Sequence, residues 1–216
     1  MSLAPNPVDL LARARADLRM GVPIVLRDAH APASGGILAA AVETLDAGRL
    51  AEIRALVTGS GKGSGRVPVV VISARRAETL KARAYDGDLA RVVLPADAGQ
   101  AWVQSVADPA DDLEAPMKGP LRSEREGDAG RHRLAMQVVK SARMLPSAVV
   151  VPLDAPDAFA TAEGLTVLEA SQTWPHLEMN SPMHSVVSAR LPIQVSEAGR
   201  LHVFRPDDGG EEHYAI

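Results

Sequence analysis

The sequence predicts an α/β layered domain followed by a β-hairpin that begins a second domain. Residues 67–72 read Val-Pro-Val-Val-Val-Ile, an apolar run typical of a strand that is buried on both faces. Helix-like segments separate this run from a second one, Ala-Val-Val-Val at residues 148–151. Near the end, Pro-Asp-Asp-Gly-Gly at residues 206–210 is a turn signal between two strand-like segments. Buried strands that alternate with helices are typical of layered α/β domains.

The first half of the chain alternates between helices and strands. Leucine and alanine recur at helical spacing over residues 8–19, which predicts an amphipathic helix that ends at Gly21. A short buried strand is expected at residues 23–26. The alanine-rich segment 37–45 predicts a packed helix, and residues 49–57 predict another. After the strand at residues 67–72 we expect a helix over residues 74–83 and a strand over residues 90–94.

The second half contains two expected loops. Residues 107–128 are rich in Asp, Pro, Glu and Gly and predict a long polar connection, of the kind that is usually mobile or functional. Helices are expected over residues 130–145 and 160–170, and a second loop over residues 171–185. Strand-like segments follow at residues 189–195, 200–205 and 212–216. Because Ile216 falls inside an expected strand, we expect the protein to continue beyond it.

The composition excludes several classes of function. The 216 residues include no cysteine, which excludes disulfides and thiolate-bound metals. A net charge of −4 is too small to indicate nucleic acid or an anionic membrane as a partner. No stretch approaches the about 20 apolar residues of a membrane span, and the N-terminus lacks the basic and apolar regions of a secretory signal. We therefore expect a cytoplasmic protein.

Two short patterns suggest chemistry but lack the residues that this chemistry needs. In the glycine-rich segment 59–65, a phosphate-binding Walker A loop would require Gly in place of Leu56 and Ser or Thr in place of Gly63. We interpret the segment as a flexible loop in which Lys62 is a candidate anion contact. His176-Leu-Glu178 matches the His-x-Glu of zinc deaminases, but their Pro-Cys-x-x-Cys partner is absent.

The C-terminal hairpin carries a more specific pattern. Residues 189–192 read Ala-Arg-Leu-Pro, and residues 212–216 read Glu-His-Tyr-Ala-Ile after the turn. These strands resemble the opening hairpin of GTP cyclohydrolase II, a hydrolase of riboflavin biosynthesis. The resemblance implies a parent reaction that converts GTP to a diaminohydroxy-ribosylaminopyrimidine phosphate, formate and diphosphate. That family holds zinc with three cysteines, so we expect no cofactor in this chain and zinc only in a part beyond Ile216.

Upstream segments carry a second pattern. They are Gly-Val-Pro at residues 21–23, Gly-Ile-Leu-Ala-Ala-Ala at 36–41, Gly-Ser-Gly at 59–61 and the expected helix from residue 130 to Pro146. In this order they resemble 3,4-dihydroxy-2-butanone 4-phosphate synthase, which is often fused in front of GTP cyclohydrolase II. The resemblance implies a synthase-like mixed sheet with flanking helices over residues 1–185. Residues 186–216 would then be the first strands of a truncated cyclohydrolase II-like domain. It also implies a homodimer.

The sequence departs from this second pattern at the metal site. The family has an acidic loop after its first strand, but Asp28 is the only acidic residue in residues 28–36. The family's Gly-His-Thr-Glu motif, which supplies a metal-binding His and an acidic group, reads Gly-Arg-His-Arg at residues 130–133. Divalent cations need several oxygen ligands, whereas Arg131 and Arg133 would repel them. We therefore expect a degenerate site without catalytic residues and without metal.

Three functions remain open at this point. The first is a non-catalytic scaffold, dimerisation or regulatory domain. Lys62, Arg131 and Arg133 are then candidate anion contacts, although solvated surface charge is the simpler interpretation of each. The second is an altered sugar-phosphate or nucleotide activity that uses a residual site, whose candidate residues are Asp28, His30 and His132. The third is a small-molecule sensor in which residues 107–128 become ordered over a ligand. The expected partners are a second copy of the chain and its own C-terminal cyclohydrolase-like domain.

Overall fold

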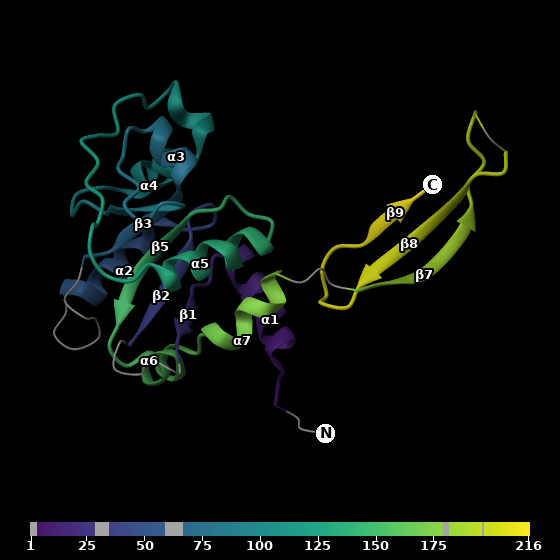
Figure 1. Cartoon of the computed structure of the whole chain (residues 1–216), viewed down its shortest axis with the longest axis horizontal. Coiled ribbons are helices and arrows are strands. Elements are labelled where there is room, and N and C mark those ends of the chain that lie inside the picture. Colours follow the sequence, from purple (N-terminus) through teal and green to yellow (C-terminus); the bar gives the residue numbers. More distant parts are fainter. Residues whose placement is uncertain (1–3, 29–34, 59–66, 179–181, 196) are drawn as a thin grey trace.

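Two β-sheets organise the chain (Figure 1). The computed structural model describes residues 4–28, 35–58, 67–178, 182–195 and 197–216. In these residues a six-stranded mixed sheet is covered by helices, and a three-stranded sheet stands apart from it. The expected fold class, a mixed α/β domain followed by a β-hairpin, is therefore confirmed.

The large sheet has the strand order β4-β3-β5-β2-β1-β6. Neighbouring strands are antiparallel except for β1 and β6, which are parallel. The strands are β1 (Ile24–Arg27), β2 (Gly36–Ala41), β3 (Val69–Ser73), β4 (Leu89–Val93), β5 (Ala148–Leu153) and β6 (Val167–Glu169).

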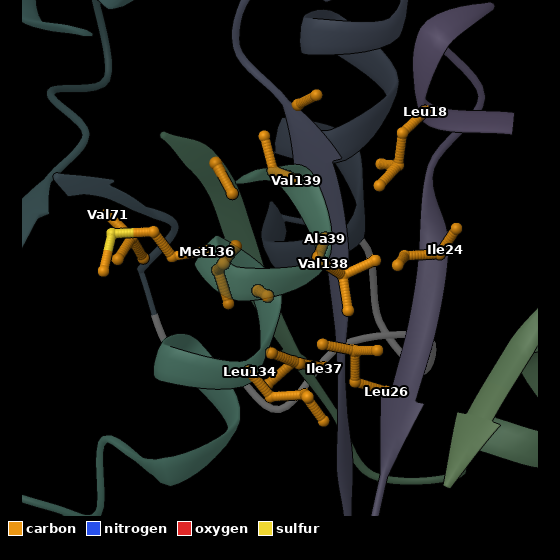
Figure 2. Close-up of a cluster of buried hydrophobic side chains, with 14 of the residues drawn as sticks. Leu18, Ile24, Leu26, Ile37, Ala39, Val71, Leu134, Met136, Val138 and Val139 are labelled. Atoms are coloured by element: carbon orange, nitrogen blue, oxygen red, sulfur yellow. The ribbon is translucent and has the colours of Figure 1, made fainter. Parts of the chain in front are cut away.

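Helices cover both faces of this sheet, because alternate residues of each strand point to opposite faces. Ile24 and Leu26 of β1 lie in one buried cluster, whereas Val25 lies in the other. Figure 2 shows Leu134 and Val138 of α5 among the apolar side chains of the first cluster. The first face packs against α1 (Pro7–Arg19), α5 (Gly130–Ser141) and α7 (Ala170–Glu178), and the second against α2 (Ala47–Thr58), α3 (Ala74–Thr79), α4 (Gln100–Ala107) and α6 (Pro156–Glu163). Among the described residues, none of these helices combines the length and the apolar character that a membrane span requires.

The helix expected over residues 37–45 is wrong. Residues 36–41 are strand β2, which pairs with β1 on one side and with β5 on the other. Every residue of β2 is buried, so its run of small apolar side chains suits a central strand that is covered on both faces. Alanine prefers a helix by well under 1 kcal/mol per residue, and packing between two layers outweighs that preference.

Two further expectations in the C-terminal half need correction. The helix expected over residues 160–170 ends at Glu163, because Gly164 adopts a left-handed conformation (φ +67°) and strand β6 follows. The loop expected over residues 171–185 is largely wrong, since α7 occupies residues 170–178 with Pro175 inside it. Trp174 and Leu177 pack against the core, and this tertiary contact compensates for the backbone hydrogen bond that proline removes.

The polar connection over residues 107–128 is tied to the body of the protein. After α4, which the sequence analysis did not anticipate, a short 3-10 turn η2 (Pro109–Asp112) begins the connection. Arg76 of α3 donates from Nη1 and Nη2 to the two carboxylate oxygens of Asp112, at 2.6 and 2.7 Å. Further along, Val92 of β4 pairs with Ser123 in an isolated bridge.

The small sheet consists of β7 (Met183–Arg190), β8 (Arg200–Pro206) and β9 (His213–Ala215), all antiparallel. The strand expected at residues 189–195 therefore lies mostly earlier in the chain. Every residue of β7 and β9 is exposed. In Figure 1 this sheet projects from the side of the body on which α1 and α7 lie.

Candidate functional site

Arg91 is a charged residue inside an otherwise apolar strand. It lies in the middle of β4 and only 2% of its side chain is exposed. Nε and Nη2 donate to the carboxylate of Asp86 at 2.8 and 2.9 Å. Nη1 donates to Glu124 Oε2 at 3.1 Å and to the carbonyl oxygen of Glu126 at 3.0 Å. The buried guanidinium therefore holds residues 124–127 against the sheet.

Helix α5 begins beside this segment, and its first turn is basic. Its N-cap, Ala129, offers no side-chain hydrogen bond, and the first turn contains no acidic residue. Arg131 donates from Nη1 to the carbonyl oxygen of Gly35, at 2.8 Å. Arg133 points elsewhere and forms a two-point ion pair with Asp88, at 2.7 Å for both bonds. Residues two apart on a helix lie on different faces, which separates the two guanidinium groups.

His132 lies between these two arginines in sequence and is 8% exposed. Its Nδ1 is buried and has no hydrogen-bond partner among the described residues. Burial, followed by repulsion from Arg91 and Arg131, lowers the pKa of His132 to about 4, although Asp86 and Asp128 oppose the shift. The imidazole is therefore neutral at neutral pH.

Arg91, Arg131 and His132 line a pocket of ≈ 590 Å³ between the start of α5, the start of β2, the end of β5 and residues 124–128. Arg131 and His132 both line it, whereas Arg133 does not. Asp28 follows the end of β1 and is not one of the lining residues. Lys62 and His30 lie outside the described residues. The structure thus brings together two of the candidates from the sequence and adds Arg91 to them.

The residues of this pocket do not fit the divalent cation that the synthase resemblance implies. Arg131 stands at the motif position of the metal-binding His and is engaged with a backbone carbonyl. The nearby imidazole of His132 lies in a positive field. Over the described ranges, no three His, Asp or Glu side chains come together as a group that could hold a metal. The charged lining residues are Arg91, Arg125, Arg131, Glu124, Glu126 and Asp128.

Neither Arg91 nor Glu124 is among the site residues predicted from sequence, although a signal for Arg91 exists. Leu89 lies in the buried cluster on the α5 face, and Arg91, two positions later, faces the same side. A cation on the buried face of a predicted strand requires a partner, because an unpaired buried charge is very unfavourable. Glu124 carries no comparable signal, because only the fold brings residues 124–127 to β4.

Comparisons with known proteins place this geometry in context. No family model matches the chain. A GTP cyclohydrolase-2 from Azospirillum brasilense is 25% identical over 209 residues, which are 94% of this chain and 52% of that protein. The chain therefore spans about half the length of this curated relative.

Several solved synthase structures match this chain. A 3,4-dihydroxy-2-butanone 4-phosphate synthase of Candida albicans matches with a TM-score of 0.55 at 16% identity, over 77% of this chain and 96% of that one. The chain has the fold of this synthase. A two-domain synthase from A. baumannii matches more of the chain, with a TM-score of 0.56 at 11% identity over 94% of this chain and 68% of that one. A synthase in complex with two magnesium ions matches with a TM-score of 0.53 at 14% identity, over 77% of this chain and 95% of that one.

Proposed function

We propose that this chain is a non-catalytic N-terminal region of a GTP cyclohydrolase II-like protein of riboflavin biosynthesis. Its synthase-fold domain then serves as a scaffold, dimerisation or regulatory domain. The alignment of 94% of this chain with 52% of a GTP cyclohydrolase-2 supports the parent family, and the solved synthases support the fold. Under this proposal the zinc chemistry of the parent protein belongs to sequence outside these 216 residues, because this chain contains no cysteine.

The observation that carries the proposal is the guanidinium of Arg131 at the place of a metal-binding imidazole. Its Nη1 donates to the Gly35 carbonyl oxygen at 2.8 Å, and the buried guanidinium of Arg91 lines the same pocket. Proton abstraction from a sugar phosphate needs strong stabilisation of the developing oxyanion, which a metal ion or placed donors supply. A guanidinium at a ligand position repels a cation instead of binding it, so we infer that the synthase reaction has been lost.

A formate-release assay tests this proposal. The purified chain is incubated with ribulose 5-phosphate and magnesium or manganese, beside a magnesium-dependent synthase of the same fold as a positive control. We expect no formate above the protein-free background. Catalytic release of formate by this chain would overturn the proposal.

A restored motif separates charge repulsion from other causes of inactivity. The triple variant Arg131→His, His132→Thr and Arg133→Glu recreates the family pattern at residues 130–133. If guanidinium repulsion keeps the cation out, the variant binds manganese more tightly than the natural chain, as measured by electron paramagnetic resonance. Equal manganese binding by both proteins would show that this repulsion is not the reason.

Ligand sensing or an altered activity at the same pocket is the second candidate. It is favoured by the neutral, buried imidazole of His132, whose Nδ1 has no partner within the described segments and which lines a ≈ 590 Å³ pocket. Thermal shift against GTP and compounds of the riboflavin pathway tests it. A stabilising ligand should lose its effect with His132→Gln and keep it with the control Arg133→Gln. If no compound raises the melting temperature, the scaffold role is favoured.

A homodimer remains part of the proposal. Light scattering coupled to size-exclusion chromatography should give twice the mass of the 22.7 kDa chain. A monomeric mass over the whole accessible concentration range would remove dimerisation from the proposed roles.

A further inference from the structure

One guanidinium joins the small sheet to the body of the protein. Arg15 of α1 donates from Nη1 to Asp208 Oδ2 at 2.8 Å, in the turn between β8 and β9. Its Nε donates to Ser141 Oγ, at the end of α5, at 3.0 Å. The Ser141 hydroxyl in turn donates to the Val138 carbonyl at 2.7 Å. Arg15 therefore ties together α1, α5 and the turn of the small sheet.

The turn is shaped to present this carboxylate. Gly209 adopts a left-handed conformation (φ +70°), and the Gly210 N–H donates to Asp208 Oδ1 at 3.0 Å. One carboxylate oxygen of Asp208 thus accepts a hydrogen bond from within its own turn, and the other accepts a hydrogen bond from Arg15. Burial acts to raise the pKa of Asp208, but the hydrogen bonds from Arg15 and Gly210 lower it overall. The carboxylate is therefore charged at neutral pH.

Little else in the described structure holds the two parts together through side-chain charges. A second ion pair, Arg143 to Glu211 at 2.6 Å, has side chains that are 55% and 69% exposed. Such exposed pairs contribute little, whereas the side chains of Arg15 and Asp208 are only 12% and 25% exposed. A pocket of ≈ 370 Å³ lies between the body and the small sheet, so the contact between them is not filled by apolar packing. Small polar contacts between domains usually permit relative motion.

We propose that the Arg15–Asp208 ion pair is a lock that sets the position of the small sheet relative to the synthase-fold body. When the pair is closed, the sheet is held against α1 and α5. When it is broken, the exposed sheet samples several orientations. This inference does not depend on the proposed function.

Spin labels on the two parts test the lock. The chain contains no cysteine, so Ala51→Cys on α2 and Ala189→Cys on β7, both exposed alanines, provide two specific labelling sites. The distance distribution between them is measured by double electron–electron resonance. We expect one narrow distribution in the labelled parent. Asp208→Asn keeps the shape of the turn residue and removes its charge, and it should widen the distribution by about twofold or more.

Two matched variants complete the experiment. Arg143→Ala removes the exposed neighbouring ion pair and should leave the distribution narrow. Arg15→Met breaks the lock from the body side and should widen it as Asp208→Asn does. Circular dichroism establishes that each variant is folded, and if Asp208→Asn fails to fold, Arg15→Met decides alone. A narrow, unshifted distribution in the folded lock variants, or equal widening in Arg143→Ala, would overturn the proposal.

Discussion

Arg91 and Asp86 form a two-point ion pair, with Nε–Oδ2 and Nη2–Oδ1 distances of 2.8 and 2.9 Å. The arginine side chain is 2% exposed and that of the aspartate 11%. Arg91 lines one wall of the pocket that His132 also lines. Burial, and after it the positive charge of Arg91, lowers the pKa of His132 and keeps that imidazole neutral. The stability of the domain and the electrostatic character of its pocket therefore depend on the same buried side chain.

Replacing Arg91 should be strongly destabilising. Arg91→Ala leaves the Asp86 carboxylate and the Glu124 carboxylate without their cation, and removing one partner of a buried pair costs about 3 kcal/mol or more. Urea denaturation measures the free energy of unfolding. The control Arg133→Ala breaks an ion pair whose side chains are 34% and 50% exposed, and should cost less than about 1 kcal/mol. Equal losses in the two variants would contradict the role given to Arg91.

His132 should make the protein less stable in mild acid. Its pKa is about 4 in the folded chain and close to 6.5 when unfolded, so the unfolded chain binds the extra proton first. The stability that the folded chain has with a neutral His132 is therefore fully present above pH 6.5 and is lost progressively as the pH falls toward 4. It amounts to roughly 3 kcal/mol at most. Urea denaturation at several pH values in this range should show that the free energy of unfolding of His132→Gln depends less steeply on pH than that of the natural chain. A pKa of His132 near 6.5 in an NMR titration of the folded protein would contradict the prediction.

Arg76 should control the accessibility of residues 107–128. Besides its ion pair with Asp112, it donates from Nε to the Val106 carbonyl at 2.8 Å and from Nη2 to the Ser105 carbonyl at 2.8 Å. Arg76→Met removes all of these bonds. Limited proteolysis with chymotrypsin should then cleave near the exposed Leu113 about tenfold faster or more. Arg75→Met, at an exposed position next to it, is the control, and unchanged cleavage of Arg76→Met would show that other contacts hold the connection.

Gly36 should not tolerate a side chain. A Cβ there would lie 2.6 Å from Pro156 Cβ and 2.7 Å from the Leu26 carbonyl oxygen, at the end of the β1–β2 pairing. Gly36→Ala should therefore cost about 2 kcal/mol through overpacking and strand displacement. At Gly99 a Cβ would meet nothing within 4 Å, so Gly99→Ala should cost less. Thermal denaturation compares the two, and similar melting temperatures would contradict this account.

The amphipathic and β-branched segments could be predicted from sequence because their signal is local. Residues 8–19 and 67–72 form the expected helix and strand to within a few positions, as α1 and β3. Residues 36–41 were harder, because a fully buried strand of small residues has the composition of a packed helix. Helix α7 was missed for a related reason. Its proline and polar residues indicate a loop, and only contact with α1 and α5 makes the helix stable.

The residues of the candidate site likewise divide into those that a local sequence signal identifies and those that only the fold brings together. Arg131 and His132 could be identified by comparing residues 130–133 with a family motif. Arg133, three residues after Gly130, belongs to the same motif but pairs with Asp88 outside the pocket. Arg91 and Glu124 are 33 residues apart and meet only in the folded chain. Arg15 and Asp208 are 193 residues apart, and nothing in their local sequence links them.

By itself, the sequence determined the layered α/β class, the absence of cysteine chemistry and the basic character of the motif at residues 130–133. These properties follow from local periodicity and from the identity of single residues, which folding does not change. Only the tertiary structure decided that residues 36–41 are a strand, that Arg91 supports the pocket and that Arg15 holds the small sheet. Each of these depends on which distant groups a residue meets after burial, because a buried charge or strand is stabilised only by its partners.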